Sequence, residues 1–403
     1  MCASNISRHG MKQQNGAVMM VMIVILVLGI TTALVGSLSA SALNTARQKI
    51  TVSALAQAKE ALLGRAVSDD NMPGSLPCPD TDNDGSAELL SGNNCPSYIG
   101  RLPWRTLRLP EIRDGSGELL WYALSLSFRD DVSTQPLNSN TKGTLEVYQA
   151  DGLTPQTQEA VAIIFSPGNP LASQNRGTVA EQNSAANYLD IANGRNNATA
   201  ASPFIAGTKS DTFNDQLLHI TTRDLMPLLE KRVAGVVKQA LTDYFTTNGY
   251  YPWADQMGGG DYDADAGENR GWLPKDAADG GAANWDDFGN TPPPPWYFAN
   301  EWYKLIYYSV AKDYARPSCS SCVDNTLSVG SNNGVRALFF MPGTAILANI
   351  SPAVLRVSNS DLSHYLEDAE NKDNANDLYV TPASQATDRD RLYWLSSALI
   401  WTP

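Results

Sequence analysis

The chain has 403 residues, with 42 acidic and 29 basic side chains and a formal net charge of −13. Its length is typical of two or three domains, and a hydrophobic content of 43% is sufficient for packed cores. An acidic surface repels polyanions, so we exclude nucleic acid and anionic lipid headgroups as partners, whereas a calcium ion or a basic protein is compatible with this charge.

The first predicted element is an apolar helix over 17–46. No charged residue occurs between Ala17 and Ala46, and about 20 apolar residues are enough to span a bilayer as a helix. Arg8 and Lys12 precede the segment and no acid does, so the positive-inside rule places this end in the cytoplasm. We therefore expect a single transmembrane helix, with globular domains on the far side of the membrane.

The residues before this helix form a short basic leader. Lys12 to Gly16 run directly into the apolar segment at Ala17. This junction resembles the prepilin leader of type IV pilins and type II secretion pseudopilins. The resemblance implies that prepilin peptidase cuts after Gly16 and methylates the new N-terminus at Ala17. A translation start at Met11 would give a leader of familiar length.

The N-terminus is also compatible with a secretory signal peptide or a plain membrane anchor. A signal peptide would account for the small residues Ala40, Ser41 and Ala42, but its apolar region is about 7–15 residues long, shorter than the run found here. A plain membrane anchor accounts for the length of the run but not for the basic leader that ends in glycine.

The fifth position after the expected cleavage site is Val21, where most pilins have a glutamate. In the family that glutamate neutralises the terminal amine of a neighbouring subunit, since a buried unpaired ammonium is costly. The resemblance therefore implies a minor, tip or priming subunit, which contacts other subunits through its N-terminal helix. The expected location is the bacterial inner membrane, with the domains in the periplasm, or outside the cell within a pilus.

The rest of the chain contains an internal repeat, in which similar segments recur in the same order. The matched pairs are Ala58–Leu62 with Val237–Leu241, Asp80–Asp84 with Asp261–Asp265, Leu120–Leu124 with Glu301–Leu305, Val161–Gly168 with Val335–Gly343, Asn187–Asp190 with His364–Glu367, and Asp215–Leu217 with Asp390–Leu392. The match of Arg101–Pro103 with Trp272–Pro274 is the weakest. Chance does not preserve order across so many matches, so we expect an internal duplication.

These patterns predict an α+β protein with a leader over 1–16, a transmembrane helix over 17–46, and pilin-like domains over 47–223 and 224–403. In each domain a helix packs on an antiparallel sheet. The first helix has an apolar stripe at Val52, Leu55, Ala58, Leu62 and Ala66. The second begins with Asp224 as N-cap and ends at Asn248-Gly249. The runs Glu159–Gly168 and Val335–Gly343 are typical of buried strands.

Two acidic loops resemble the first half of a calcium-binding loop. Alternating aspartates followed by glycine allow carboxylates to converge on one cation while the glycine makes the turn. The candidate ligands are Asp80, Asp82, Asp84 and Glu88 in the first unit and Asp261, Asp263, Asp265 and Glu268 in the second. Calcium and a solvated acidic turn are the two interpretations, and calcium in related pseudopilins supports the first.

Four cysteines follow the apolar segment as two close pairs, which suits disulfides in an oxidising compartment. We expect bridges between Cys78 and Cys95 and between Cys319 and Cys322. Buried free thiols are the alternative for both pairs. A redox-active site at the second pair would need a helix after it, and zinc would need two further ligands.

The sequence lacks a nucleophile elbow, a phosphate-binding loop, a zinc-protease motif and a dinucleotide fingerprint. We therefore expect no enzyme and identify no small-molecule substrate. The segment from Gly281 to Tyr303 is rich in proline and tryptophan, which fits a loop covering the second core or, alternatively, a loop that binds protein or glycan.

These features lead to the hypothesis of a structural pilin or pseudopilin-like subunit that presents two domains to a partner. The alternatives are a membrane-anchored binding or adhesion protein that enters no fibre, and a secreted hydrolase. The hydrolase stays open because carboxylate pairs have no sequence signature.

Overall fold

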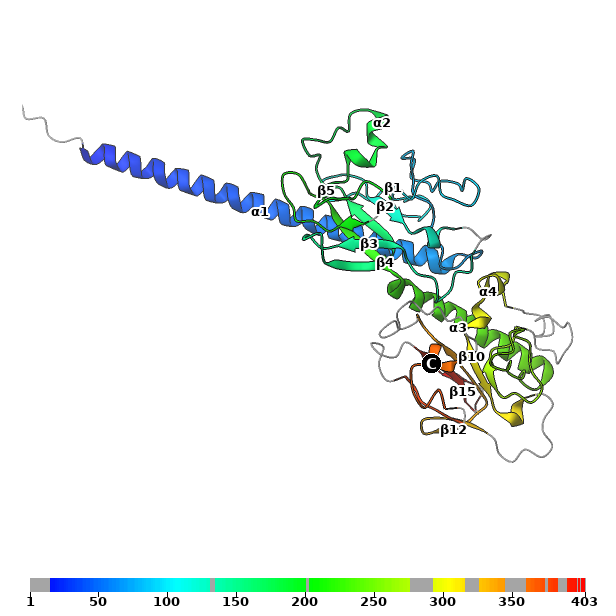
Figure 1. Ribbon diagram of the computed structural model, residues 1–403. Helices are drawn as coiled ribbons and strands as arrows, with labels where there is room; N and C mark the ends of the chain where they lie inside the picture. The colour runs from blue at the N-terminus through cyan, green and yellow to red at the C-terminus, as the bar shows by residue number, and fades with distance from the viewer. Residues whose placement is uncertain are drawn as a thin grey trace, which may run out of the picture.

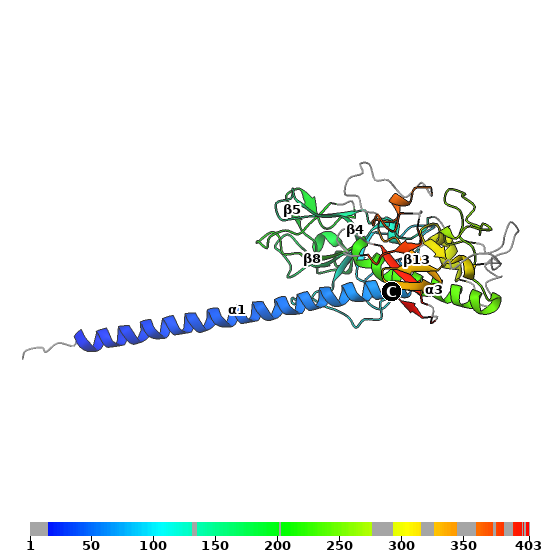
Figure 2. The same cartoon turned by 90° about the horizontal axis from the view of Figure 1, so that it is seen from below.

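The computed structural model describes residues 15–130, 135–200, 203–275, 293–315, 326–344, 360–373, 376–382, 390–396, 398 and 400–402; within 15–40 it describes only the side chains of Met22 and Leu26. The protein is α+β, with one long helix and two sheet-containing units (Figure 1). Figure 2 shows that the helix projects from one end of the body formed by the two units.

Helix α1 (Asn15–Ser68) is 54 residues long, and its C-terminal part belongs to the core of the first unit. Leu55, Ala58, Leu62 and Ala66 are buried at the spacing of one helix face, as predicted. Val52 was expected on the same stripe but is 54% exposed. Thr51, the preceding residue, is only 4% exposed, so Val52 lies on the outward face of a turn that the protein body already covers on its other side.

Among the residues that the structure describes, no helix is both long enough and apolar enough to cross a membrane. This corrects our expectations of a transmembrane helix over 17–46 and of an inner-membrane protein with periplasmic domains. The apolar run continues without a break into a helical segment with charged side chains such as Arg47 and Lys49, and from Ala54 onward the apolar face of α1 packs on the protein's own sheet. A run of apolar residues therefore predicted a separate span where the chain forms one continuous helix that is partly built into the core.

The first unit contains a six-stranded sheet. Its strands are β1 (Ile99–Arg101), β2 (Trp121–Leu124), β3 (Leu145–Tyr148), β4 (Pro155–Ser166), β7 (Phe204–Ile205) and β8 (Gln216–Thr221). The C-terminal half of β4 lies between β2 and β8, and its N-terminal half pairs with β3. The buried strand predicted over 159–168 is thereby confirmed as the centre of this sheet.

Short elements connect these strands. They are η1 (Leu126–Phe128), α2 (Val179–Gln182), η2 (Ala185–Asn187), β5 (Ile191–Ala192) and β6 (Arg195–Asn196). Helix α1 contacts β4 and β8, so it covers one face of the sheet.

Helix α3 (Thr222–Asn248) opens the second unit. Its N-cap is Thr221 and not Asp224 as predicted, because Asp224 lies one turn inside and its Oδ2 accepts a hydrogen bond from the Thr221 backbone N–H at 2.8 Å. The helix ends at Asn248, and Gly249 follows with a left-handed φ of 79°. The predicted C-terminal stop is confirmed, because glycine adopts that conformation without strain.

The second unit contains a five-stranded sheet in the order β16-β15-β13-β10-β9, and β11 joins β12 to β14 in a smaller one. The strands are β9 (Arg270–Trp272), β10 (Tyr307–Val310), β11 (Leu327–Val329), β12 (Asn332–Val335), β13 (Ala337–Met341), β14 (Leu378–Tyr379), β15 (Arg391–Leu395) and β16 (Trp401–Thr402). The short helices are α4 (Pro295–Ala299), η4 (Trp302–Lys304), η5 (Lys312–Tyr314) and η6 (Leu362–His364). The predicted strand over 335–343 corresponds to β13.

The two sheets repeat the same set of pairings. In both, four antiparallel strands lie in the order β1-β2-β4-β8 or β9-β10-β13-β15. Each unit also has one parallel pair, β3 with β7 or β11 with β14. Tyr122 and Tyr308, from the second strand of each sheet, donate their hydroxyls to the carbonyls of Pro77 and Pro252.

This correspondence differs from the sequence match in the second strand of the sheet. In the second sheet, β10 takes the position that β2 has in the first sheet. The sequence match had instead aligned β2 with Glu301–Leu305. That segment contains η4 instead, with Trp302 fully buried. A shared Trp-Tyr pair led the match to the wrong segment. Trp296 and Trp302 are both buried, as expected for a segment that covers the second core, and 281–292 lie outside the described residues.

The two units pack directly against each other. One hydrophobic cluster extends from Ala54 in α1 to Leu395 in β15. Lys59 of α1 forms an ion pair with Asp224 of α3 at 3.2 Å, and the Arg232 guanidinium donates to the backbone oxygen of Asp69 at 2.6 Å. The division of the chain at residue 224 stays a prediction, but a continuous core crosses it.

Candidate functional site

The expected processing site lies in the first turn of α1. Gly16 and Ala17 are the second and third residues of this helix, and Val21 follows one turn later. Of the side chains in this part of the helix, the structure describes those of Met22 and Leu26, which are 68% and 63% exposed. Residues four apart lie on one helix face, so these two present an apolar strip to the surroundings.

The backbone of the first acidic loop is hydrogen-bonded to the side chain of Asp80, which is only 1% exposed. Its two carboxylate oxygens accept hydrogen bonds from the backbone N–H groups of Asn83 and Gly85, both at 2.7 Å. Gly85 has a φ of 85°, and a Cβ there would lie 2.5 Å from the ring of Trp104. Only glycine therefore allows this turn to close against the indole.

Asp80, Asp82 and Glu88 each place one carboxylate oxygen within 4.8 Å of the others. Among the described residues this is the only such group of potential metal ligands. Burial raises the pKa of Asp80, and the nearby Asp82 and Asp84 raise it further. Asp84 is not part of the group, and its carboxylate accepts a hydrogen bond from the Ser86 backbone at 2.6 Å. Three converging oxygens are ligands that calcium prefers, and the expected calcium site stays a prediction.

The second acidic loop is built differently. Asp261 and Asp263 lie near Asp265, whose carboxylate accepts from the Gln256 backbone at 2.8 Å. Glu268 is held by its backbone, where its carbonyl accepts from Ala254 at 2.9 Å. These candidate ligands do not converge as the first group does.

Asp255, which the sequence comparison missed, takes the place of Asp80 in the second sheet. Each of the two aspartates exchanges backbone hydrogen bonds with the first strand, Asp80 with Arg101 and Asp255 with Trp272. Asp255 is fully buried, and its burial together with the nearby Asp265 and Asp261 raises its pKa to about 7. A Pro-x-x-Asp pattern beginning at Pro77 and Pro252 was the signal that could have found it.

The predicted disulfide between Cys78 and Cys95 is present. Both cysteines are buried, and the bridge closes the segment that contains the first acidic loop. By the chain-entropy argument a loop of this length contributes about 3 kcal/mol to stability. Cys319 and Cys322 lie outside the described residues.

Paired acids recur at matching places in the two units. Asp215 accepts the Asp190 backbone N–H on a carboxylate oxygen at 2.8 Å, and Asp190 accepts the Asp215 backbone N–H at 3.2 Å. Glu367 and Asp390 make the same exchange in the second unit. Burial raises the pKa of Asp190 and, together with the charge of Asp190, raises that of Asp215 well above its usual range. Because their oxygens fasten two loops together, we assign these pairs a structural role.

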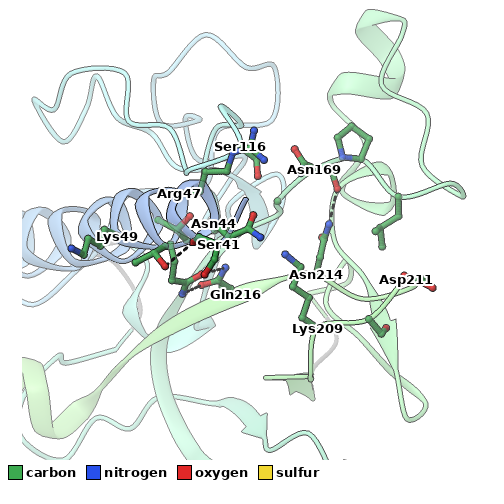
Figure 3. Close-up of a pocket in the computed structure, with 18 of the residues that line it drawn as sticks. Ser41, Asn44, Arg47, Lys49, Ser116, Asn169, Lys209, Asp211, Asn214 and Gln216 are labelled. Carbon is green, nitrogen blue, oxygen red and sulfur yellow. Dashed lines mark hydrogen bonds between the residues drawn. The ribbon is translucent and has the colours of Figure 1, made fainter. Parts of the chain in front are cut away.

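A polar pocket that the sequence did not indicate lies beside α1, where the helix leaves the body (Figure 3). It has a volume of about 1040 Å³, and residues from α1, from the turn after Asp114, from the end of β4 and from the start of β8 line it. Its lining comes from segments far apart in the chain, so no local motif could have indicated it.

Comparison with known proteins identifies no matching family model, curated protein or solved structure.

Proposed function

We propose that the chain is a minor, tip or priming subunit of a type IV pilus or of a type II secretion fibre. The observation that carries this proposal is that one end of α1 is buried in the protein and the other end projects from it. Its C-terminal part is fastened into the core at Leu55, Ala58 and Leu62, whereas its N-terminal part projects from the body (Figure 2) with Met22 and Leu26 exposed. A helix that is anchored in its own domain at the C-terminal end and apolar in its projecting N-terminal part is suited to helix–helix contacts between subunits.

The residues at the start of α1 give further support. The basic leader ends at Gly16 immediately before the apolar run, which is the arrangement that prepilin peptidase recognises in the family. Val21 cannot neutralise the terminal amine of a neighbour as a glutamate would. A subunit without that carboxylate is suited to the end of a fibre, where one neighbour is missing.

The packing of the two units supports a role in presentation to a partner. Ion pairs and hydrogen bonds link the units, for example between Lys59 and Asp224 and between Ser139 and Glu230. Two units joined through one core would move together and transmit force from a fibre as one body. No catalytic function is proposed.

The test of this proposal is processing at Gly16. When the chain is produced together with prepilin peptidase, intact-mass measurement should find an N-terminus at Ala17 carrying one added methyl group. Gly16→Trp should leave the leader attached, because the peptidase requires a small residue there. Gly16→Ala, which keeps a small residue at the junction, should be processed normally. An intact leader on the unaltered chain, or a mature N-terminus at Leu43, would contradict the proposal.

We also propose that the loop of Asp80, Asp82 and Glu88 binds calcium and thereby fixes the first unit. A ligand at 100 times its Kd that binds only the folded state stabilises it by about 2.7 kcal/mol, so millimolar calcium should raise the melting temperature. Asp82→Ala should abolish that rise, whereas Asp84→Ala, outside the group, should retain it. If calcium leaves the melting temperature of the unaltered protein unchanged, the loop is an acidic turn held by its backbone hydrogen bonds.

A further inference from the structure

The polar pocket beside α1 is enclosed by four segments of the chain (Figure 3). One wall is the helix from Ser41 to Thr51, and opposite it lie the residues from 166 to 172 after β4 and those from 209 to 216 leading into β8. Ser116 lines it from the turn between Asp114 and Glu118. All the α1 residues from 41 to 50 are exposed, so the pocket opens to the outside at the base of the projecting helix.

Buried contacts hold these walls in place. The carboxylate of Asp114, itself 4% exposed, accepts hydrogen bonds from the backbone of Ser116 and Gly168 and from the Ser166 hydroxyl at 2.7 Å. This group therefore ties the turn to the end of β4. Gly115 lies so close to α1 that a Cβ on it would be 2.1 Å from the Arg47 carbonyl oxygen. The turn and the helix are thus in direct backbone contact.

A pair of amides closes the other side of the pocket. The side chain of Gln48 on α1 donates to that of Gln216 on β8 at 2.6 Å, and Gln216 donates back at 3.1 Å. Asn214 donates to the Asn169 carbonyl at 2.7 Å and so links the two loops (Figure 3). The pocket is therefore shaped by contacts among its own walls and does not depend on the projecting end of α1.

The charge of the pocket is opposite to that of the whole chain. Arg47, Lys49 and Lys209 line it, with Asp211 as the single acidic side chain among the lining residues. None of the three cations forms an ion pair within the described part of the chain. Arg47 and Lys49 are two residues apart on α1 and point to different sides of the helix, so Arg47 and Lys209 are the cations that can face a common ligand. Unpaired cations at a pocket, in a protein of net charge −13, favour an anionic ligand.

We propose that this pocket binds an acidic peptide segment of a neighbouring subunit. A guanidinium binds a carboxylate through two parallel hydrogen bonds, and the amide and hydroxyl lining can bond to a peptide backbone. No aromatic ring lines the pocket, which disfavours a sugar, because sugar rings pack their C–H faces on aromatic side chains. The position at the base of α1, with Leu43 and Ile50 exposed on the same stretch, places the pocket where a neighbour would approach along the helix. The choice of a subunit as the source of the peptide rests on the proposed function.

The test measures binding of a fluorescent aspartate-serine hexapeptide to the full chain by anisotropy. An otherwise identical asparagine-serine peptide is the control ligand. The aspartate peptide should bind at least ten times more tightly than its neutral counterpart, and binding should weaken as salt is raised because exposed charges are screened. Arg47→Glu with Lys209→Glu should weaken binding of the acidic peptide at least tenfold. Lys231→Glu, an exposed lysine on α3 outside the pocket lining, should leave binding unchanged.

Three results would overturn the assignment. Equal affinity for the two peptides, or full binding by the Arg47→Glu, Lys209→Glu variant with an unchanged melting temperature, would exclude an acidic-peptide site here. Displacement of the peptide by equimolar inorganic phosphate would assign the pocket to a small anion instead. The outcome is separable from processing at Gly16, because a chain that keeps its leader but binds the peptide would retain the pocket and lose the fibre role.

Discussion

Glu230→Ala is expected to lower the free energy of unfolding by about 3–5 kcal/mol, the cost of removing one partner from a buried ion pair. Glu230 lies on α3 and is only 1% exposed. One of its carboxylate oxygens accepts the hydroxyl of Ser139 from the first unit at 2.5 Å, and the other accepts from the guanidinium of Arg391 on β15. The substitution removes a charge that joins three segments and leaves Arg391 without this carboxylate.

The measurement is unfolding in denaturant, monitored by a spectroscopic probe placed in each unit. Glu60→Ala, which removes an exposed glutamate of α1, should change stability by less than about 0.5 kcal/mol. Ser139→Ala should remove only the hydrogen bond that Glu230 receives from the first unit and cost about 1.5–3 kcal/mol, since the bond is to a charged group. A loss below about 1 kcal/mol for Glu230→Ala would show that the carboxylate is solvated in solution and does not link the units.

Local patterns in the sequence were sufficient for the elements that depend on near neighbours. The extent of α3 follows from an amphipathic face ending at Asn248-Gly249, and β4 and β13 follow from β-branched and aromatic runs. The bridge between Cys78 and Cys95 follows from their spacing around one loop. The N-cap was displaced from Asp224 to Thr221, because an acid one turn inside a helix can complete a capping box as well as begin a helix.

Features that depend on contacts between distant segments could not be predicted. Apolar composition predicted a membrane span over 17–46, but composition alone does not report what a helix packs against. Only the C-terminal part of α1, from about Thr51 onward, is buried against the protein body. Asp255 has no acidic neighbours immediately beside it in sequence, so only its pairing with β9 reveals its role. The pocket combines Arg47 from α1 with Lys209 from the segment before β8, and these residues line one pocket because β8 lies beside α1.

Val237→Asp is expected to cost at least about 4 kcal/mol and to abolish cooperative folding near physiological temperature. Val237 is fully buried on α3, the helix that covers the second sheet, as the contact of Lys238 with the ring of Tyr393 at 4.2 Å indicates. A carboxylate there would lose its hydration, and its neighbours are apolar. It would have to be protonated or the helix would have to leave the sheet, and either change is costly.

Gln239→Asp provides the matched control, because it places the same carboxylate two residues away on the exposed face of α3 and should cost less than about 1 kcal/mol. Circular dichroism during thermal unfolding measures both variants. Because a single hydrophobic cluster extends across both units, Val237→Asp should lower the melting of probes in the first unit as well as in the second. If only the second unit were destabilised, the shared core would contribute little and each unit would fold alone. Unchanged melting of both units would show that α3 does not pack on the second sheet in solution.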